Sequence, residues 1–247
     1  MIKRALALAL VLPLAACATA PGSQAPSYIT VFAAASLQPP FDAIKRQLQS
    51  SSNLAITYNY AGTQTLTSQL SQGARADVFA SADEAHMVPL ENASLIAGEP
   101  KVFVHNRLEI AVERGNPKGI HSLADLARAG IVVVLADPSV PAGKYAQVAL
   151  AKAKVKVHPA SLEPQVTGVL SKVALGEADA GIVYVSDITT SGRVEGVPIP
   201  DDQNVVADYL IAELSSAANR EGANQFIAYV LSSSGQSALA TAGFEKA

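Results

Sequence analysis

Four short turns in the sequence carry small or hydroxyl-bearing residues at points where an apolar strand is predicted to pass directly into a helix. They are Ala33-Ala-Ala-Ser36, Ala61-Gly-Thr63, Pro141-Ala-Gly143 and, less regularly, Glu163-Pro-Gln-Val166. The first N–H groups of a helix have no partner within the helix and carry partial positive charge, so they bind anions without a cation. Several such turns, if they converge, would form a donor-rich cavity for a small oxyanion.

Each of these turns also has an ordinary structural interpretation. Ser36 and Thr63 are typical helix N-cap residues, and Pro141 and Pro164 are of a type that is common in the first turn of a helix. Tyr184 lies on an otherwise apolar predicted strand and, taken alone, is expected to be a half-buried tyrosine whose hydroxyl reaches water or backbone. The residue types alone therefore leave open whether these turns bind a ligand or only begin helices.

Signatures of enzymes are absent from the sequence. It contains no nucleophile elbow, Ser-x-x-Lys segment, phosphate-binding loop, dinucleotide-binding glycine pattern or zinc-protease motif. The four histidines lie in different predicted elements and never pair at the spacing of metal ligands; they are His86, His105, His121 and His158. We therefore assign no catalytic residue, no direct protein ligand to a metal and no cofactor.

The elements that would hold the four turns alternate between apolar strands and amphipathic helices, which is typical of α/β proteins with largely parallel sheets. Strands are expected at 29–33, 54–60, 77–83, 102–104, 108–112, 131–136, 181–185 and, as the last strand, 205–214. Helices are expected after Ser36, around 66–70, from 122, over 141–153, from 163, over 223–231 and over 237–242.

The first 16 residues are typical of a leader. Lys3 and Arg4 precede a 12-residue apolar run, which is shorter than the roughly 20 residues of a membrane-spanning helix. The run ends at Leu14-Ala-Ala-Cys17, which resembles the lipobox of bacterial lipoproteins, whose cysteine is acylated. We expect a signal peptide at 1–16, a lipidated Cys17 and a flexible tether through 27; the alternative is a plain signal peptide with a chance cysteine.

The charge and composition of the chain limit which classes of binding partner are expected. The chain has 247 residues, 49% of them hydrophobic, which is enough for one large or two small domains. Its 18 basic and 21 acidic side chains give a net charge of −3, and loss of Lys3 and Arg4 leaves 16 against 21, or −5. Nucleic acid is not an expected partner, because phosphate backbones select basic surfaces. Any anion must instead be bound by local neutral donors.

Read together, the segments around the turns closely resemble the molybdate-binding proteins of bacterial ABC import systems. The resemblance extends over about 28–244, in order and with matching spacing, and is carried by 31–37, 72–83, 137–145 and 176–184. It implies a type II periplasmic binding protein fold with two α/β lobes, each a mixed, mostly parallel sheet flanked by helices. The implied lobes are 28–105 plus 206–247 and 106–205, with the ligand in the cleft between them.

The resemblance also implies the site and the partners. The family's oxyanion donors fall on Ser36, Thr63, Ala142, Val166 and Tyr184, with Thr63 where the family has a serine. The implied ligand is molybdate or tungstate, held by hydrogen bonds alone. The partners would be an ABC permease and, through Cys17, the membrane at the outer face of the cytoplasmic membrane or in the periplasm, with the protein acting as a monomer.

Two alternatives remain beside this interpretation. One is a binding protein for sulfate or another tetrahedral oxyanion, because sulfate has the same shape and charge as molybdate and size selection depends on a cavity radius that sequence does not give. The other, from a different class, is a secreted hydrolase, which would need a reactive serine or a perturbed carboxylate in the cleft.

Overall fold

The computed structural model describes residues 27–247, so the predicted leader and Cys17 lie outside the described residues. The strands are β1 (Ser27–Ala34), β2 (Leu54–Ala61), β3 (Val78–Ser81), β4 (Ile96–Glu113), β5 (Val133–Ala136), β6 (Ser161–Glu163), β7 (Ala180–Tyr184), β8 (Val194–Pro198), β9 (Val206–Leu214) and β10 (Glu245–Lys246). The helices are α1 (Gln38–Ser51), α2 (Thr63–Ser71), α3 (Val88–Asn92), α4 (Pro141–Lys152), α5 (Val166–Ala174), α6 (Val185–Ser191), α7 (Arg220–Leu231) and α8 (Ser233–Thr241). Two 3-10 segments, η1 (Ala35–Leu37) and η2 (Leu123–Ala127), complete the set.

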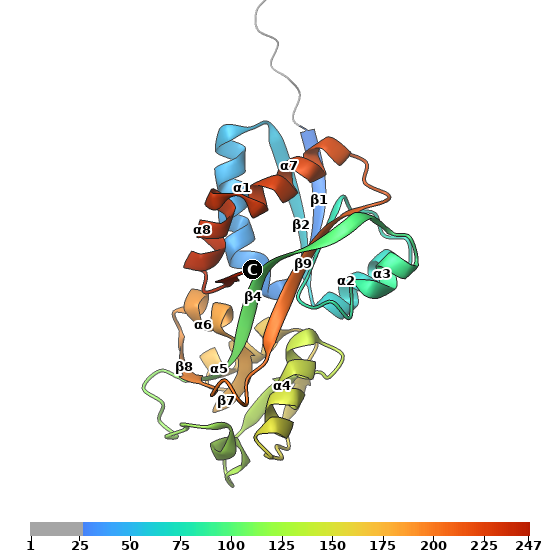
Figure 1. The fold of residues 1–247 in the computed structure, drawn as a ribbon. Helices are drawn as coiled ribbons and strands as arrows, with labels where there is room; N and C mark the ends of the chain where they lie inside the picture. Colours follow the sequence, from blue (N-terminus) through green and yellow to red (C-terminus); the bar gives the residue numbers. More distant parts are fainter. Residues whose placement is uncertain (1–26) are drawn as a thin grey trace, which may run out of the picture.

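The strands form two sheet regions that share β4 (Figure 1). The first sheet region has the strand order β2-β1-β3-β9-β4, and the second has β4-β7-β5-β6. The short strands β8 and β10 both pair with β4, one in each region. Helices α1, α2, α3, α7 and α8 lie with the first sheet region, and α4, α5 and α6 lie with the second (Figure 1).

Strand β4 joins the two regions without a break, whereas two short strands at 102–104 and 108–112 are predicted from the sequence. It pairs with β9 as far as Arg107 and with β7 and β8 from Leu108 onward. The polar Asn106 interrupts the apolar pattern, but it is buried and donates a hydrogen bond to Ser186 Oγ at 2.8 Å. A satisfied polar side chain does not end a strand, which explains the wrong boundary.

Both sheet regions are mixed, as predicted, but they contain more antiparallel pairs than expected. The pairs β1–β2, β1–β3, β5–β6 and β5–β7 are parallel. Each antiparallel pair includes β4 or β9. These two strands carry the chain between the regions in opposite directions, so they pair antiparallel with each other and with neighbours on either side.

Two other predicted elements differ from the structure. Glu163 does not open a helix: it ends β6, where it pairs with Ala136, and α5 begins at Val166. The strand β9 is not the last, because β10 follows it near the C-terminus and pairs with β4. The short elements α3, α6 and β8 have too few residues to give a periodic signal.

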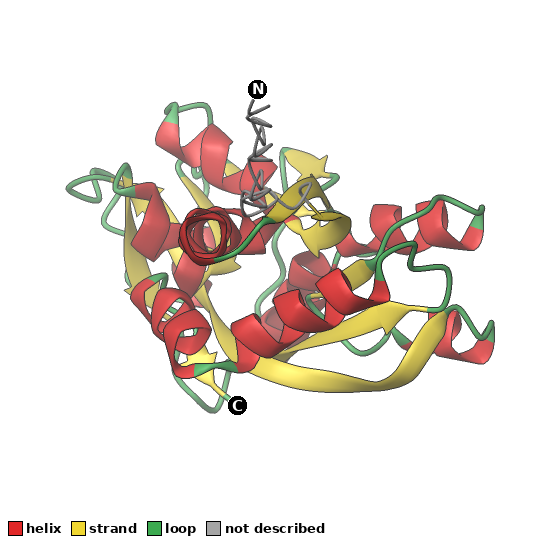
Figure 2. Ribbon diagram, turned by 90° about the horizontal axis from the view of Figure 1, so that it is seen from above, coloured by secondary structure: helices red, strands yellow, loops and turns green. Residues whose placement is uncertain are grey.

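Helix α1 shows how an amphipathic face forms the core of the first region. Phe41, Ile44 and Leu48 recur at helical spacing and are fully or almost fully buried. The Phe41 ring meets the Phe226 ring of α7 edge-to-face, with centroids 5.5 Å apart. Helices α7 and α8 pack on each other, α8 packs on α1, and α7 packs on β1 and β9, so the C-terminal helices cover the sheet that the N-terminal strands begin. Figure 2 shows the helices packed against the strands from above.

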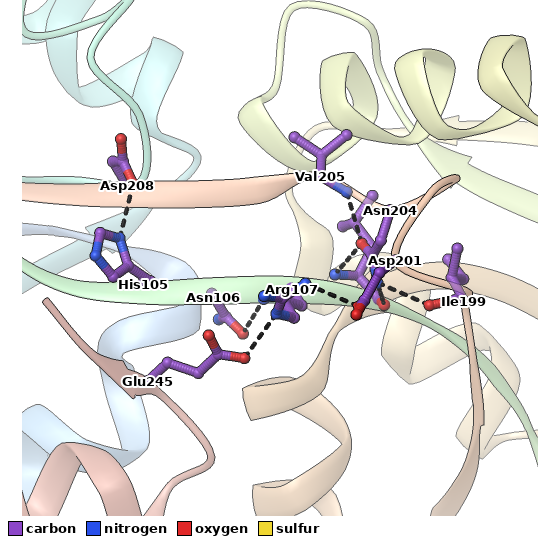
Figure 3. A network of polar contacts seen from close by, with 10 residues as sticks. His105, Asn106, Arg107, Ile199, Asp201, Asn204, Val205, Asp208 and Glu245 are labelled. Atoms are coloured by element: carbon purple, nitrogen blue, oxygen red, sulfur yellow. Dashed lines mark hydrogen bonds and ion pairs between the residues drawn. The ribbon is translucent and has the colours of Figure 1, made fainter.

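Arg107 lies on β4 where that strand changes partners, and its side chain contacts segments from both regions (Figure 3). Its Nε donates to Glu245 Oε1 in β10 at 2.8 Å, and another guanidinium nitrogen donates to Asp201 Oδ1 at 3.0 Å. Asp201 lies in the loop between β8 and β9. The guanidinium therefore joins the C-terminal strand of the first region to a loop of the second.

The buried Asn204 side chain binds backbone groups at the same junction between the two sheet regions (Figure 3). Its side-chain oxygen accepts from the N–H groups of Leu108 at 3.0 Å and Val205 at 2.8 Å. Its amide nitrogen donates to the carbonyl oxygens of Leu108 at 2.9 Å and Ile199 at 3.2 Å. The Asn204 side chain thus holds together the two segments that cross between the regions, β4 at Leu108 and the segment leading into β9 at Val205, and both of its polar atoms are hydrogen-bonded.

Candidate functional site

A cavity lies between the two sheet regions, and it is lined by residues that all come from strand ends and helix starts. The lining residues are Ala34, Ala35, Ser36, Gly62, Thr63, Ala82, Val140, Pro141, Ala142, Val166 and Tyr184. The five residues to which the resemblance assigns oxyanion binding are all among them. Ser36 and Thr63 come from the first region, and Ala142, Val166 and Tyr184 come from the second.

Three helices begin at this cavity, and each presents backbone N–H groups that precede its first helical hydrogen bond. Thr63 is the first residue of α2, whose first such bond runs from Thr65 N to Gly62 O. In α4 the first runs from Lys144 N to Val140 O, which leaves the Ala142 amide ahead of it. Val166 opens α5 in the same way, ahead of the bond from Gly168 N to Gln165 O. The cavity therefore gathers the positive ends of three helices.

The Thr63 side chain keeps a hydroxyl donor at the position where the related family has serine. Thr63 is 1% exposed, and its Oγ1 accepts a hydrogen bond from the Ala82 backbone N–H at 3.3 Å. Since the oxygen acts as the acceptor in that bond, the hydroxyl hydrogen is left to donate elsewhere. The extra methyl group of threonine does not remove this donor from the cavity wall.

The Ser36 hydroxyl is buried in η1, directly after β1. Its Oγ lies 2.8 Å from the hydroxyl oxygen of Tyr209, which is 173 positions further along the chain. Either oxygen could donate in this contact. Tyr209 lies on β9 and is fully buried, so the Ser36 side chain is held by a residue of the strand that returns the chain from the second region.

Tyr184 contributes a buried hydroxyl without a partner among the described residues. The side chain is 1% exposed, ends β7 and lines the cavity. Burial is the main cause that raises the pKa of Tyr184 well above its usual value, and the nearby Tyr209 adds to the effect. The Tyr184 hydroxyl therefore stays protonated and able to donate. Buried hydroxyls are normally paired, so an unpaired one in a cavity wall indicates a ligand atom or a water.

The charged side chains around the cavity do not provide long-range attraction for an anion. None of the lining residues in the described part of the chain has a charged side chain. Asp83, next to the lining residue Ala82, is buried, and its Oδ1 accepts from the His86 backbone N–H at 3.0 Å. Any attraction of an oxyanion must therefore come from hydrogen bonds and helix ends at close range.

Two contributors to the site could not be found from the sequence. Gln64 Nε2 donates to the Pro164 carbonyl oxygen at 2.8 Å and so joins α2 to the segment before α5 across the site. Tyr209 contacts Ser36 and lies in a predicted strand, but a tyrosine in a strand gives no signal that its hydroxyl meets a turn 173 positions away. Both depend on long-range geometry rather than on a local pattern.

The cavity wall can donate hydrogen bonds from three side-chain hydroxyls and from the first amides of three helices. No group of three His, Cys, Asp or Glu side chains within residues 27–247 is placed to hold a metal ion. A small, fully deprotonated oxyanion offers only acceptors, which complements such a wall. A ligand that must itself donate would require a wall hydroxyl to turn its own hydrogen away and accept instead.

The two sheet regions, their two crossings and the cavity between them define an α/β periplasmic binding protein fold. The chain is similar to the sulfate-binding protein SubI from Mycobacterium tuberculosis, with a TM-score of 0.82 and 19% identity, over 89% of this chain and 87% of that one. It is also similar to the periplasmic molybdate-binding protein of Azotobacter vinelandii, with a TM-score of 0.77 and 19% identity, over 87% and 98%. These likenesses establish the fold.

Sequence similarity identifies the family. Residues 29–245 match the bacterial extracellular solute-binding proteins. The molybdate-binding protein ModA of Mycobacterium tuberculosis is 43% identical over 220 residues, which cover 88% of this chain and 84% of that protein. The chain belongs to the bacterial extracellular solute-binding protein family and is similar to its molybdate-binding members. It is therefore a binding protein and not an enzyme, which removes the hydrolase alternative.

Proposed function

We propose that this protein captures molybdate, and tungstate as well, outside the cytoplasm and delivers it to an ABC permease. The observation that carries this proposal is the cavity wall, in which every polar group assigned to the ligand is a neutral donor and the buried Tyr184 hydroxyl has no hydrogen-bond partner among residues 27–247. The 43% identity to a molybdate-binding protein supports the same ligand. The assigned donors are Ser36, Thr63, Ala142, Val166 and Tyr184.

The donor-only wall argues against phosphate. Phosphate keeps at least one proton near neutral pH, and among the lining side chains only a hydroxyl that turns its own hydrogen away from the ligand could accept that O–H. Sulfate is the remaining competitor, because it is also a fully deprotonated tetrahedral dianion. The fold does not separate the two, since sulfate-binding and molybdate-binding structures both resemble it; the higher sequence identity to a molybdate-binding protein favours molybdate.

We infer that the two sheet regions act as lobes, 28–105 with 206–247 and 106–205, and that they close on the ligand. Support comes from the placement of the donors, two from one region and three from the other, so that one oxyanion would contact both. The regions are joined by β4 and by the segment leading into β9, which limits the motion to a hinge. The closed protein would then dock on the permease as a monomer.

The lipid anchor at Cys17 is a separate part of the proposal. The lipobox-like sequence ends at Cys17, which lies outside the described residues, and none of the helices in residues 27–247 is long and apolar enough to cross a membrane. Substitution Cys17→Ser would move the protein from the membrane fraction to the soluble exported fraction and abolish labelling by a fatty acid. Membrane retention of that variant would contradict the anchor.

Isothermal titration calorimetry of the purified protein tests the ligand. Molybdate and tungstate are expected to bind with similar affinity, sulfate at least about 100-fold more weakly and phosphate more weakly still; a hundredfold is about 2.7 kcal/mol. A preference for sulfate over molybdate would assign the protein to sulfate uptake instead. Failure of all four anions to bind would contradict an oxyanion site altogether.

A further inference from the structure

Tyr209 occupies an unusual place in relation to the cavity, because it contacts two of the five assigned donors without lining the cavity itself. Its hydroxyl oxygen is 2.8 Å from Ser36 Oγ, and its ring meets the Tyr184 ring edge-to-face with centroids 5.8 Å apart. Ser36 belongs to the first region and Tyr184 to the second. Tyr209 lies on β9, close to where the chain re-enters the first region.

The position of the Tyr209 ring is fixed by its surroundings. The side chain is fully buried, and the rings of Phe103 and Phe244 meet it edge-to-face with centroids 6.4 Å and 5.2 Å away. Contacts on several sides leave the hydroxyl little freedom to move away from Ser36. Burial also raises the pKa of Tyr209 far above its usual value, so the hydroxyl remains protonated.

The direction of the Ser36–Tyr209 hydrogen bond decides what the cavity can bind. Each hydroxyl has one hydrogen, so only one of them donates in their shared bond. If Tyr209 donates, the Ser36 hydrogen is free to point to a ligand oxygen. If Ser36 donates, its oxygen faces the cavity as an acceptor, and the wall is no longer made of donors alone. A phenol is intrinsically a stronger hydrogen-bond donor than an aliphatic hydroxyl, because its ring withdraws electron density from the oxygen, so Tyr209 is the better donor of the two.

We propose that Tyr209 is a positioning residue that donates its hydroxyl hydrogen to Ser36 and thereby holds Ser36 as a donor toward the oxyanion. This inference rests on the proposed function, because it assumes that Ser36 contacts the ligand. It adds a specificity role: Tyr209 disfavours oxyanions that carry a proton, because Ser36 could accept from them only by turning its own hydrogen away from the ligand and leaving it unpaired. The variant Tyr209→Phe frees the Ser36 hydroxyl to rotate and to accept.

The test compares molybdate, sulfate and inorganic phosphate binding to the wild-type protein and to Tyr209→Phe by calorimetry, with weak ligands measured by competition against molybdate. In Tyr209→Phe we expect molybdate and sulfate to bind about 3- to 15-fold more weakly, as for one lost hydrogen bond. Phosphate should weaken less or not at all. The molybdate-to-sulfate affinity ratio stays constant, and the molybdate-to-phosphate ratio falls.

A merely structural role would weaken all three anions by the same factor, and that result would overturn the inference. Tyr58→Phe is the matched control, because it removes a tyrosine hydroxyl away from the cavity that donates a part-buried hydrogen bond to the Phe41 carbonyl oxygen at 2.9 Å. That variant should leave both affinity ratios unchanged. Thermal melts of both variants establish that the proteins compared are folded.

A double-mutant cycle gives a second test. If Tyr209 acts through Ser36, Tyr209→Phe should weaken molybdate binding no further in a Ser36→Ala background. Fully additive effects of the two substitutions would overturn the inference. If the wild-type protein binds molybdate and Tyr209→Phe binds all three anions with unchanged affinity, only the role of Tyr209 is contradicted. If the wild-type protein binds no oxyanion, the proposed function on which this inference rests is contradicted.

Discussion

The Gln64 side-chain amide donates a hydrogen bond to the Pro164 carbonyl oxygen at 2.8 Å, although the two residues are 100 positions apart. Gln64 lies in the first turn of α2 and Pro164 lies two residues before the start of α5, so the bond joins two of the helix starts that line the cavity. It shows the two sheet regions in contact at the site. The distance between α2 and the Pro164 carbonyl oxygen is therefore a measure of the proposed closure of the two regions.

Gly62→Ala should hinder this closure. Gly62 has φ −59° and ψ 139°, which alanine adopts easily, so backbone strain is not the cause. A Cβ atom at Gly62 would lie 2.6 Å from the Pro164 carbonyl oxygen, and 2.5 and 2.6 Å from the two terminal atoms of the flexible Gln64 side chain, which can move aside more easily than backbone. Relief of that clash requires the two regions to separate, and we expect molybdate affinity measured by calorimetry to fall by about 1–3 kcal/mol.

Gln64→Ala is the matched control for this substitution. It removes the exposed hydrogen bond to Pro164 and should lower affinity by no more than about 1 kcal/mol. In the variant that carries both Gly62→Ala and Gln64→Ala, the loss of molybdate affinity caused by Gly62→Ala should persist, because the clash with the Pro164 carbonyl oxygen involves a backbone atom that Gln64→Ala does not remove. Wild-type affinity in Gly62→Ala would show that this close approach does not matter for binding.

Ser36→Ala removes a hydroxyl donor from the cavity wall. Hydrogen bonds to charged groups contribute about 1.5–3 kcal/mol, so molybdate should bind about 10- to 150-fold more weakly. The protein should remain folded, because alanine fits the space of serine. Ser171→Ala, on α5 outside the cavity, removes an exposed serine and should bind as the wild type does. Unchanged affinity in Ser36→Ala would exclude Ser36 from the site.

Asp187 should make stability depend on pH. Burial raises its pKa from 3.8 to about 7, partly offset by the Tyr184 backbone N–H, which donates to the carboxylate at 3.0 Å. Between about pH 4 and pH 7 the unfolded chain therefore releases a proton that the folded protein retains. The free energy of unfolding should fall as pH rises from about 4 to about 7. Above about pH 7, where Asp187 is ionised in both states, this residue should no longer make the free energy of unfolding depend on pH.

Chemical denaturation at several pH values tests the role of Asp187. The variant Asp187→Asn cannot titrate, so its free energy of unfolding should decline less than that of the wild type between pH 4 and pH 7. Parallel pH profiles for the two proteins would show that Asp187 titrates at the same pH in the folded and unfolded states.

Asn204→Ala should destabilise the junction between the regions. The substitution leaves the N–H and C=O groups of Leu108 and two further backbone groups without their partners. Unpaired buried groups are expensive, and we expect urea denaturation to show a loss of about 2–4 kcal/mol. Asn224→Ala, an exposed asparagine on α7, should change stability by less than about 1 kcal/mol. Equal losses in the two variants would refute this role for Asn204.

The turns of the site were accessible from the sequence because each is a local feature. A strand that passes into a helix at Ser36, Thr63 or Ala142 is marked by small residues, hydroxyls and proline within a few positions. The resemblance to a known family then indicated that these turns converge, which no local pattern could do. In the structure they line one cavity together with Val166 and Tyr184.

The features that sequence reasoning missed are those that depend on long-range pairing. The continuity of β4 across Asn106 follows from the pairing of that residue with Ala207 of β9, and the Asn106 side chain is satisfied by Ser186, 80 positions away. The start of α5 at Val166 rather than Glu163 follows from the pairing of Glu163 with Ala136 in a parallel strand. The contact of Tyr209 with Ser36 follows from the return of the chain along β9. Such relationships are properties of the assembled sheets.

The central claim is that one oxyanion lies between the two sheet regions and contacts donors from both. A crystal structure of the protein with molybdate, with data collected to record the anomalous scattering of molybdenum, tests it most directly. We predict a single strong anomalous peak in the cavity, with molybdate oxygens within hydrogen-bond distance of the Ser36, Thr63 and Tyr184 hydroxyls and the Ala142 and Val166 amides. A peak outside this cavity, or a cavity that contains no molybdenum at saturating molybdate, would contradict the claim.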